Sequence, residues 1–193
     1  MMENFFSIQK SDSRGLFDGL NIMKHEEFCD EWMNQYPVLF VTLKGVEALS
    51  FEESYKTLLV RLSELCKKNR YLIDSEKVDA DDKKVFLNLA VKKAELAEVK
   101  DSLKTIMRMM AAHYGKQVIL LIDEYDVPLA KASELNTEEN RYYQQMLDVI
   151  RGMFDAALKT NEYLKFAVIT GCLRIAKESI FTGTNNFMSY SDL

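Results

Sequence analysis

Three acidic residues follow one short apolar segment and are the first candidates for chemistry in this sequence. The segment Gln117–Ile122 reads Q-V-I-L-L-I and runs directly into Asp123 and Glu124, then Tyr125 and Asp126. Carboxylates at the carboxyl end of a central strand lie at the crevice where α/β sheets bind ligands. One carboxylate can bind Mg²⁺ through water, and the next can orient or deprotonate an attacking water. This pattern does not distinguish an ATPase from a metal-dependent nuclease, and a strand that simply ends in a polar loop is the alternative without function.

A second polar group follows another apolar segment. Thr170 and Gly171 end that segment, and Arg174 and Lys177 begin a short helix-like stretch. A hydroxyl at the tip of an adjacent strand could sense a γ-phosphate or position water, and an arginine could stabilise developing phosphoryl charge. The alternative is a strand, a turn and a helix with Arg174 on a solvated face. Both interpretations remain open from the residues alone.

A glycine-rich phosphate loop is missing from these residues. No G-x-x-x-x-G-K-[ST] occurs, and the 7 glycines are isolated from one another. Such a loop supplies the backbone N–H groups and the lysine that hold the β- and γ-phosphates. Its absence argues against autonomous ATP hydrolysis by this chain.

The elements that would position these side chains are three short apolar segments. They are Pro37–Leu43, Gln117–Ile122 and Lys165–Thr170, each with the character of a strand buried on both faces. Helix-like stretches alternate with them, which favours an α/β fold with a parallel sheet covered by helices. We expect helices at about 50–69, 79–93, 97–114, 137–158 and 174–180, with the segment 71–98 as a charged helical excursion on the surface.

Two sequence signals predict helix ends. Ser50, followed three residues later by Glu53, predicts a capping box at the start of the first long helix. Gly115 is placed to end the third helix in the left-handed conformation.

Composition indicates an ordinary globular protein of 193 residues with 48% hydrophobic and 28% charged residues. The formal net charge of −5 argues against a broad nucleic-acid or anionic-membrane footprint. The 3 cysteines show no disulfide framework or zinc spacing. No signal peptide and no membrane-spanning run are seen. The expectation is a cytoplasmic protein without a membrane partner.

Four stretches together resemble a prokaryotic family, the AAA-ATPase-like family. They are Leu16–Ile22 (L-F-D-G-L-N-I), Tyr36–Leu43 (Y-P-V-L-F-V-T-L), His113–Leu129 with D-E-Y-D-V-P-L at its end, and Ile169–Asn186 beginning I-T-G-C-L-R. The resemblance covers nearly the whole chain. It implies a three-layer P-loop NTPase-like domain that uses ATP and Mg²⁺, usually followed by a PD-(D/E)XK nuclease-like domain.

The resemblance assigns roles to single positions. Asp123 falls on the Walker B aspartate, which is expected to hold Mg²⁺, and Glu124 on the glutamate expected to polarise water. Thr170 falls on the polar tip of the sensor-like strand, and Arg174 on the arginine of T-G-x-L-R. These four are the candidate catalytic residues, and Asp123 is the candidate metal ligand.

The chain departs from the family pattern at both ends. The family's phosphate loop, R-P-R-R-F-G-K-[ST], would precede a helix end that resembles Met1–Phe6, so residues 1–193 are expected to be a single partial domain truncated at both ends. The related fold orders its strands 5-1-4-3-2, and the three segments here would be strands 2, 3 and 4. They stay contiguous, but strand 165–170 becomes an unprotected edge, for which we expect dimerisation, swapping or aggregation.

Three functions follow as hypotheses. The first is an ATPase module whose Mg²⁺ and ATP belong to the full-length parent, with none bound tightly by this chain. The second is a non-catalytic interaction or dimerisation module derived from an ATPase. The third and weakest is a metal-dependent nuclease using Asp123, Glu124 and Asp126, because no E-x-K pattern follows and the chain is acidic.

Overall fold

A parallel sheet forms the centre of the computed structural model, which describes residues 1–135 and 141–172. Its strands are β1 (Val38–Thr42), β2 (Val118–Asp123) and β3 (Leu164–Ile169), in the order β1-β2-β3. All pairings are parallel, with β2 in the middle. The three predicted segments, their parallel arrangement and their contiguous order are therefore confirmed. The strands also follow the chain order, so each connection crosses over one face of the sheet.

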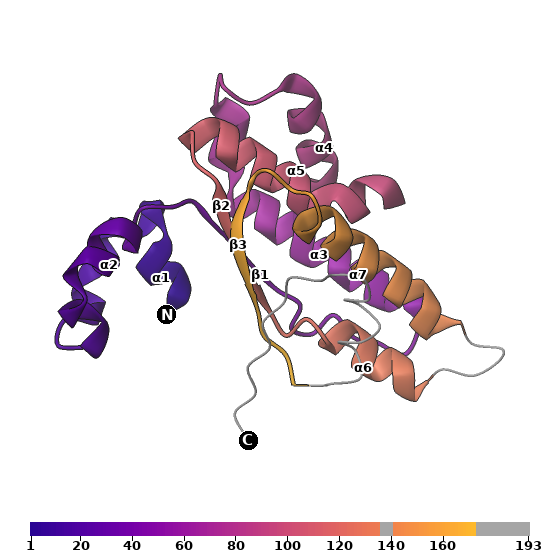
Figure 1. Ribbon diagram of the computed structural model, residues 1–193. Coiled ribbons are helices and arrows are strands. Elements are labelled where there is room, and N and C mark those ends of the chain that lie inside the picture. Colours follow the sequence, from indigo (N-terminus) through magenta and orange to yellow (C-terminus); the bar gives the residue numbers. More distant parts are fainter. Residues whose placement is uncertain (136–140, 173–193) are drawn as a thin grey trace.

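Helices cover both faces of this sheet, as Figure 1 shows with the sheet seen edge-on. The described helices are α1 (Met2–Phe6), η1 (Ile8–Phe17), η2 (Asn21–Lys24), α2 (Glu26–Trp32), α3 (Phe51–Lys68), η3 (Arg70–Asp74), α4 (Ala80–Ala90), α5 (Leu96–Tyr114), α6 (Val127–Glu134) and α7 (Tyr142–Leu158). The helices α3, α5 and α7 lie on one side, and the segment 1–36 lies on the other. This is the three-layer α/β arrangement of P-loop-like folds.

The larger core lies between the sheet and the helices α3, α5 and α7. Strand residues of one parity, including Leu39, Leu120 and Ile122, pack there against apolar helix faces. In α5, for example, Leu103 and Ile106 are fully buried. Helix α4 packs on α3 and α5 at the periphery of this layer. The charged segment 71–98 thus folds into η3, α4 and the start of α5.

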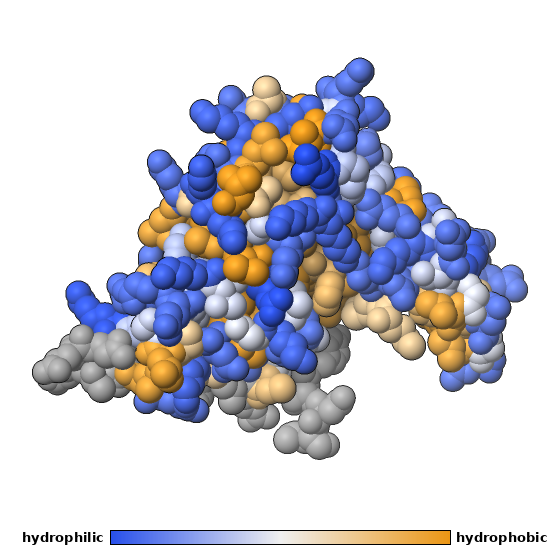
Figure 2. Space-filling view, turned by 180° about the vertical axis from the view of Figure 1, so that it is seen from behind, coloured by the Kyte–Doolittle hydropathy of each residue, from blue (hydrophilic) through white to orange (hydrophobic). Residues whose placement is uncertain are grey.

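The smaller core lies between the opposite face of the sheet and an N-terminal unit, residues 1–36. Ile119 and Leu121 of β2 meet Phe5, Phe6 and Met33 of this unit in one buried cluster. The unit does not bury all of its own apolar residues, since Leu16 is 65% exposed and Leu20 40% exposed. Figure 2 shows apolar surface on this part of the molecule, at the lower right. The N-terminal unit is a thin cover for this face.

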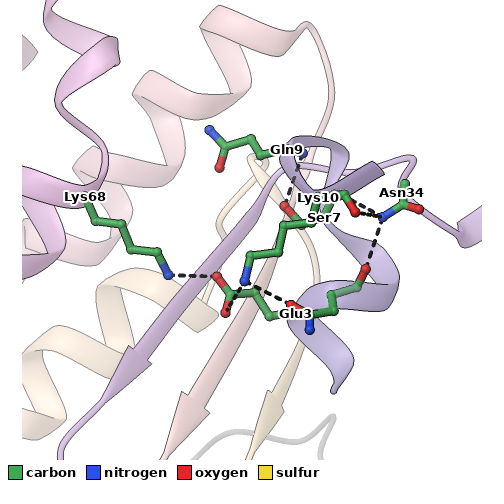
Figure 3. A network of polar contacts seen from close by, with 7 residues as sticks. Glu3, Ser7, Gln9, Lys10, Asn34 and Lys68 are labelled. Carbon is green, nitrogen blue, oxygen red and sulfur yellow. Dashed lines mark hydrogen bonds and ion pairs between the residues drawn. The ribbon is translucent and has the colours of Figure 1, made fainter. Parts of the chain in front are cut away.

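A polar network joins the N-terminal unit to the end of α3 (Figure 3). Glu3 of α1 forms ion pairs with Lys68 of α3, at 2.8 Å, and with Lys10 of η1, at 3.2 Å. Lys68 Nζ also lies 5.9 Å from the ring centroid of Phe40 on β1. Asn34 holds the unit together internally, because its Nδ2 lies within hydrogen-bonding distance of three backbone carbonyls of the same unit. The ion pair between Glu3 and Lys68 connects the two layers past the outer strand β1.

Several predicted helix features are confirmed. Helix α3 begins after Ser50, whose Oγ accepts from the Glu53 N–H at 3.3 Å, so one of the two bonds of the predicted capping box is present. Asp79 caps α4 in the same way, and Gly115 ends α5 with a φ of 66°.

Other helix boundaries were wrong. Helix α4 ends at Ala90 instead of Lys93, because the chain turns there and Lys92 adopts a φ of 61°. A full capping box is found at Glu95 and Glu98 of α5, where the sequence had not predicted one. Helix α6 was not predicted, and the helix expected at 174–180 lies outside the described residues.

The outer strand β3 is the least buried of the three. None of its residues is buried, and Lys165 is exposed, whereas Leu39 and Val41 of β1 are buried. The sequence predicted that this strand would lie at an edge, and the strand order places it there. Within residues 1–135 and 141–172, β2 is the strand paired with it.

Candidate functional site

Polar side chains lie in a row at the carboxyl ends of the three strands. Thr42 ends β1 and pairs in register with Asp123, which ends β2, and Thr170 directly follows β3. Thr170 Oγ1 donates to Asp123 Oδ1 at 2.7 Å. The Thr170 N–H continues the sheet by donating to Ile122 O at 2.9 Å. The parallel pairing of β2 with β3 therefore brings two predicted site residues, Asp123 and Thr170, into direct contact.

Asp123 is held from both sides while one of its oxygens stays available. Its backbone oxygen accepts from the Leu43 N–H at 2.9 Å, which extends the β1–β2 ladder. Its side chain is half-buried. In the described part of the chain, the one hydrogen-bond partner of the Asp123 carboxylate is Thr170, and that bond uses Oδ1. Oδ2 can therefore bind a cation without breaking this contact.

Glu124 stands in an unusual backbone conformation. Its φ is 55°, in the left-handed region that a residue with a Cβ adopts at a cost of roughly 1–3 kcal/mol. Its carbonyl accepts from the Val127 N–H at 3.2 Å, which closes a tight turn between β2 and α6. Such strain concentrates at functional sites. Directly after Asp123, this turn directs the chain sharply away from β2.

The Asp126 side chain is buried and bonded to the connection after β3. It is 3% exposed, and its Oδ2 accepts from the Cys172 N–H at 2.9 Å. Its neighbour Tyr125 is 7% exposed, and burial together with the negative charge of Asp126 raises the pKa of the Tyr125 phenol. The third acid of D-E-Y-D is thus a buried structural contact of the β3 turn.

Gly171 lies against the same two residues. A Cβ built at Gly171 would come within 2.5 Å of Asp126 Oδ1 and of two ring carbons of Tyr125. The backbone also meets there, since the Tyr125 N–H donates to Thr170 O at 3.1 Å. The two turns therefore approach more closely than any side chain at position 171 would permit.

The donor set fits Mg²⁺ in one particular way. Among the described residues, no group of three or more His, Cys, Asp or Glu side chains converges on one point. Mg²⁺ is usually bound by one or two carboxylates together with water and substrate phosphates. Asp123, with one carboxylate oxygen available, fits a Mg²⁺ ion that arrives with phosphate. A nuclease-type site of Asp123, Glu124 and Asp126 is not formed.

A shallow hollow lies beside this region and contains none of the predicted residues. It measures about 420 Å³ and is lined by Glu47, Ala48, Leu49, Ala130, Lys131 and Glu134. These residues come from the loop after β1 and from α6. The hollow is a separate surface feature, so it does not define the candidate site.

The sequence predicted four catalytic residues, and three of them lie in the described part of the chain. Asp123 and Thr170 touch, and Glu124 follows Asp123 in the strained turn. Arg174 lies outside the described residues. The roles of Gly171 and of the Asp126 side chain were missed. Their sequence signal was the glycine directly after Thr170, which allows the D-E-Y-D turn to come close.

Together, the parallel sheet, its helical layers and the acidic end of its central strand define an α/β protein of the P-loop-like, three-layer class. Comparison with known families makes this specific. A family model described as "Predicted AAA-ATPase" matches residues 1–181. The chain belongs to this AAA-ATPase-like family, whose description implies ATP and Mg²⁺ in general.

A curated relative and the solved structures add little about function. The chain is 27% identical, over 81 residues, to an uncharacterized protein in the vnfD 5′ region of Azotobacter chroococcum mcd 1. That match covers 42% of this chain and 15% of the relative. No solved structure matches the chain. In the described residues, no helix is both long and apolar enough to cross a membrane.

Proposed function

We propose that the Asp123–Thr170 edge is the part of an ATP site that handles Mg²⁺ and water. The observation that carries this proposal is the 2.7 Å hydrogen bond between Thr170 Oγ1 and Asp123 Oδ1 at the carboxyl ends of adjacent parallel strands. Membership in a family described as a predicted AAA-ATPase supports it. The phosphate-gripping loop is not among these 193 residues. ATP hydrolysis is therefore proposed for a protein in which such a loop is joined to them.

Each residue has a distinct task in this proposal. Asp123 would hold the cation, and Thr170 fixes the rotamer of Asp123 through its bond to Oδ1. Bound Mg²⁺ supplies charge neutralisation for the phosphates. Glu124, raised out of the strand direction by its left-handed backbone, orients the attacking water and accepts its proton. Arg174 is proposed to stabilise phosphoryl charge.

The test begins with the gene. Reading the DNA upstream of Met1 shows whether R-P-R-R-F-G-K-[ST] precedes it in frame. If it does, the longer protein should release phosphate from ATP and Mg²⁺. Asp123→Asn and Glu124→Gln should each lower that rate by about 10²–10³, the usual effect of removing one catalytic group. Asp148→Asn, on the exposed face of α7, is the matched control and should leave the rate unchanged.

Two results would overturn this function. One is ATP hydrolysis that survives both substitutions. The other is an upstream region closed by stop codons, which would leave no phosphate loop to be joined to these residues. For the chain alone, we expect binding weaker than about 1 mM, because its sequence lacks the glycine-rich loop that holds the β- and γ-phosphates.

A second candidate function is self-association through β3. Two observations favour self-association. The apolar residues 166–169 are only half-buried, and the outer edge of β3 pairs with no other strand in the described residues. Exposed edges of this kind are templates for a further strand. We propose a second copy of this chain as the partner, and a molar mass that rises with concentration would support it.

A further inference from the structure

The turn after β2 and the turn after β3 are cross-linked at several points. Tyr125 N–H donates to Thr170 O at 3.1 Å, and Cys172 N–H donates to Asp126 Oδ2 at 2.9 Å. Between these two bonds lies Gly171, where a Cβ would meet Asp126 and Tyr125 at 2.5 Å. Thr170, which contacts Asp123, is thus followed directly by a tightly held turn.

The Asp126 carboxylate is committed to this turn and not to its own helix. Asp126 is the N-cap of α6, the position at which an aspartate commonly accepts a hydrogen bond from an N–H of the first turn. Here its side chain makes no such cap bond. It reaches instead to the backbone of the neighbouring strand connection, and it does so while almost fully buried. Hydrogen bonds from N–H groups to a buried carboxylate are among the stronger ones in proteins.

Position 170 depends on this arrangement because it has little other support. Thr170 is exposed, and it lies one residue beyond the end of β3, on an outer strand. Its contacts are to Ile122, Asp123 and Tyr125 of β2 and its turn. If the turn at 171–172 moves away, no strand among residues 1–135 and 141–172 lies on the other side of Thr170 to hold its hydroxyl.

We propose that Asp126 is a positioning residue: its carboxylate fixes the 171–172 turn and so holds the Thr170 hydroxyl on Asp123. In this role Asp126 binds neither the cation nor the water. It sets the relative position of Thr170 and Asp123, the two residues that contact each other in the candidate site. The importance of that geometry for catalysis rests on the proposed function, but the coupling itself is a property of this chain without any ligand.

Amide hydrogen exchange and a methyl resonance test this coupling in the unliganded chain. In Asp126→Ala, we expect exchange at the Cys172 and Tyr125 amides to speed up by about tenfold or more, because a charged acceptor is lost. The Thr170 methyl resonance should move at the same time. Asp126→Asn keeps a carbonyl oxygen for the Cys172 N–H, so its exchange should lie closer to wild type than that of Asp126→Ala.

A matched control separates coupling from general loss of stability. Asp82 is also a buried carboxylate, at 7% exposure, but it pairs with Arg108 on the far side of the large core. Asp82→Ala should lower the unfolding temperature and leave the Cys172 amide and the Thr170 methyl as they are. Equal changes at these two positions in both alanine variants would overturn the proposal. So would an Asp126→Ala chain with a folded core and an unmoved Thr170 methyl.

ATP hydrolysis by the longer protein distinguishes a failure of the coupling from a failure of the ATP site. If the unliganded measurements show the expected changes but the longer protein does not hydrolyse ATP, the coupling is supported and the proposed ATP site is contradicted. If ATP is hydrolysed and Asp126→Ala keeps the wild-type rate and methyl position, the coupling falls and the ATP site stands.

Discussion

Thr170 Oγ1 donates a 2.7 Å hydrogen bond to Asp123 Oδ1, so a hydroxyl from one strand end fixes a carboxylate on the next. The two residues lie 47 positions apart in sequence. They meet because β2 and β3 are parallel neighbours that end at the same edge of the sheet. This bond holds the Asp123 carboxylate through Oδ1 and leaves Oδ2 without a hydrogen-bond partner among the described residues. A carboxylate that is already oriented loses less freedom when it binds a cation.

Replacing the hydroxyl of Thr170 tests the strength of this contact. Thr170→Val keeps the shape of the side chain and removes the donor, so the free energy of unfolding should fall by about 0.5–1.5 kcal/mol. Thr170→Ser keeps the donor, so its free energy of unfolding should fall by less. Urea denaturation measures both variants. A valine variant as stable as the serine variant would show that the bond contributes nothing to the folded state.

Adding one methyl group at Gly171 should be costly. Gly171→Ala places a Cβ at 2.5 Å from Asp126 Oδ1 and from Tyr125 ring carbons, both of which belong to buried residues. We expect a loss of about 1–3 kcal/mol, the usual range for overpacking. Gly15→Ala is the control, because the nearest atom to its Cβ, Asp18 Oδ2, is 3.8 Å away. Equal unfolding free energies for the two variants would contradict the close approach of the turns.

The sequence predicted the sheet well for a physical reason. A strand buried on both faces needs an unbroken apolar run, and Gln117–Ile122 provides one that no amphipathic helix would have. The same reasoning located Asp123 and Thr170, because polar residues must begin where burial ends. The Ser50 and Gly115 helix ends were equally readable, since each depends on a local bond or a local backbone angle.

The remaining features depend on contacts that no local pattern encodes. Asp126 looked like a third member of an acidic cluster, but its side chain turns to Cys172, a residue brought near only by the pairing of β2 with β3. Within the N-terminal unit, only the helix end at Met1–Phe6 was predicted, because its other short helices draw their stability from packing on the sheet and not from periodicity. Its tie through Glu3 and Lys68 joins residues far apart in the chain.

The ion pair between Glu3 and Lys68 should make stability depend on pH. Burial alone raises the pKa of Glu3, but the hydrogen bonds and charges of Lys68 and Lys10 outweigh it and lower that pKa below its ordinary value. A lowered folded-state pKa gives stability that is present above the unfolded-state pKa and is lost as pH falls through the folded-state pKa.

The Lys68→Gln variant isolates this contribution. At neutral pH it should be less stable than wild type by at most about 1 kcal/mol, because Lys68 is largely exposed. The difference should shrink as acid protonates Glu3. Lys67→Gln, at the exposed neighbouring position, is the control and should show no such pH dependence. A gap between Lys68→Gln and wild type that stays constant from neutral to acidic pH would argue against the pair.

The three cysteines should react at very different rates. Cys172 is exposed, whereas Cys29 and Cys66 are buried, and burial raises the pKa of the Cys66 thiol to about 12. A thiol reagent at mildly alkaline pH should therefore modify one group per folded chain quickly and two more after unfolding. Cys172→Ser should remove the fast phase. Fast modification that persists in this variant would place another thiol at the surface.

The outer edge of β3 can be tested with a charge. Val168→Lys puts a lysine on the half-buried face of this strand, a common protection of natural sheet edges. If copies of the chain associate through β3, the variant should stay monomeric at concentrations where wild type gains mass by light scattering. Val60→Lys on α3, at a position 38% exposed, is the matched control. Wild type that stays monomeric over the accessible concentration range would exclude this interface.

The arrangement of the sheet in chain order has a consequence for how the chain folds. Strand β1 can pair with β2 only after α3, α4 and α5 have been spanned, so that ladder closes a long loop before it gains any contact. Strands β2 and β3 are separated only by α6 and α7, and their loop closes at lower entropic cost. We therefore expect the C-terminal half, with Asp123 and Thr170 already joined, to be the folding nucleus. Substitutions there should slow refolding, whereas those in β1 should mainly speed unfolding.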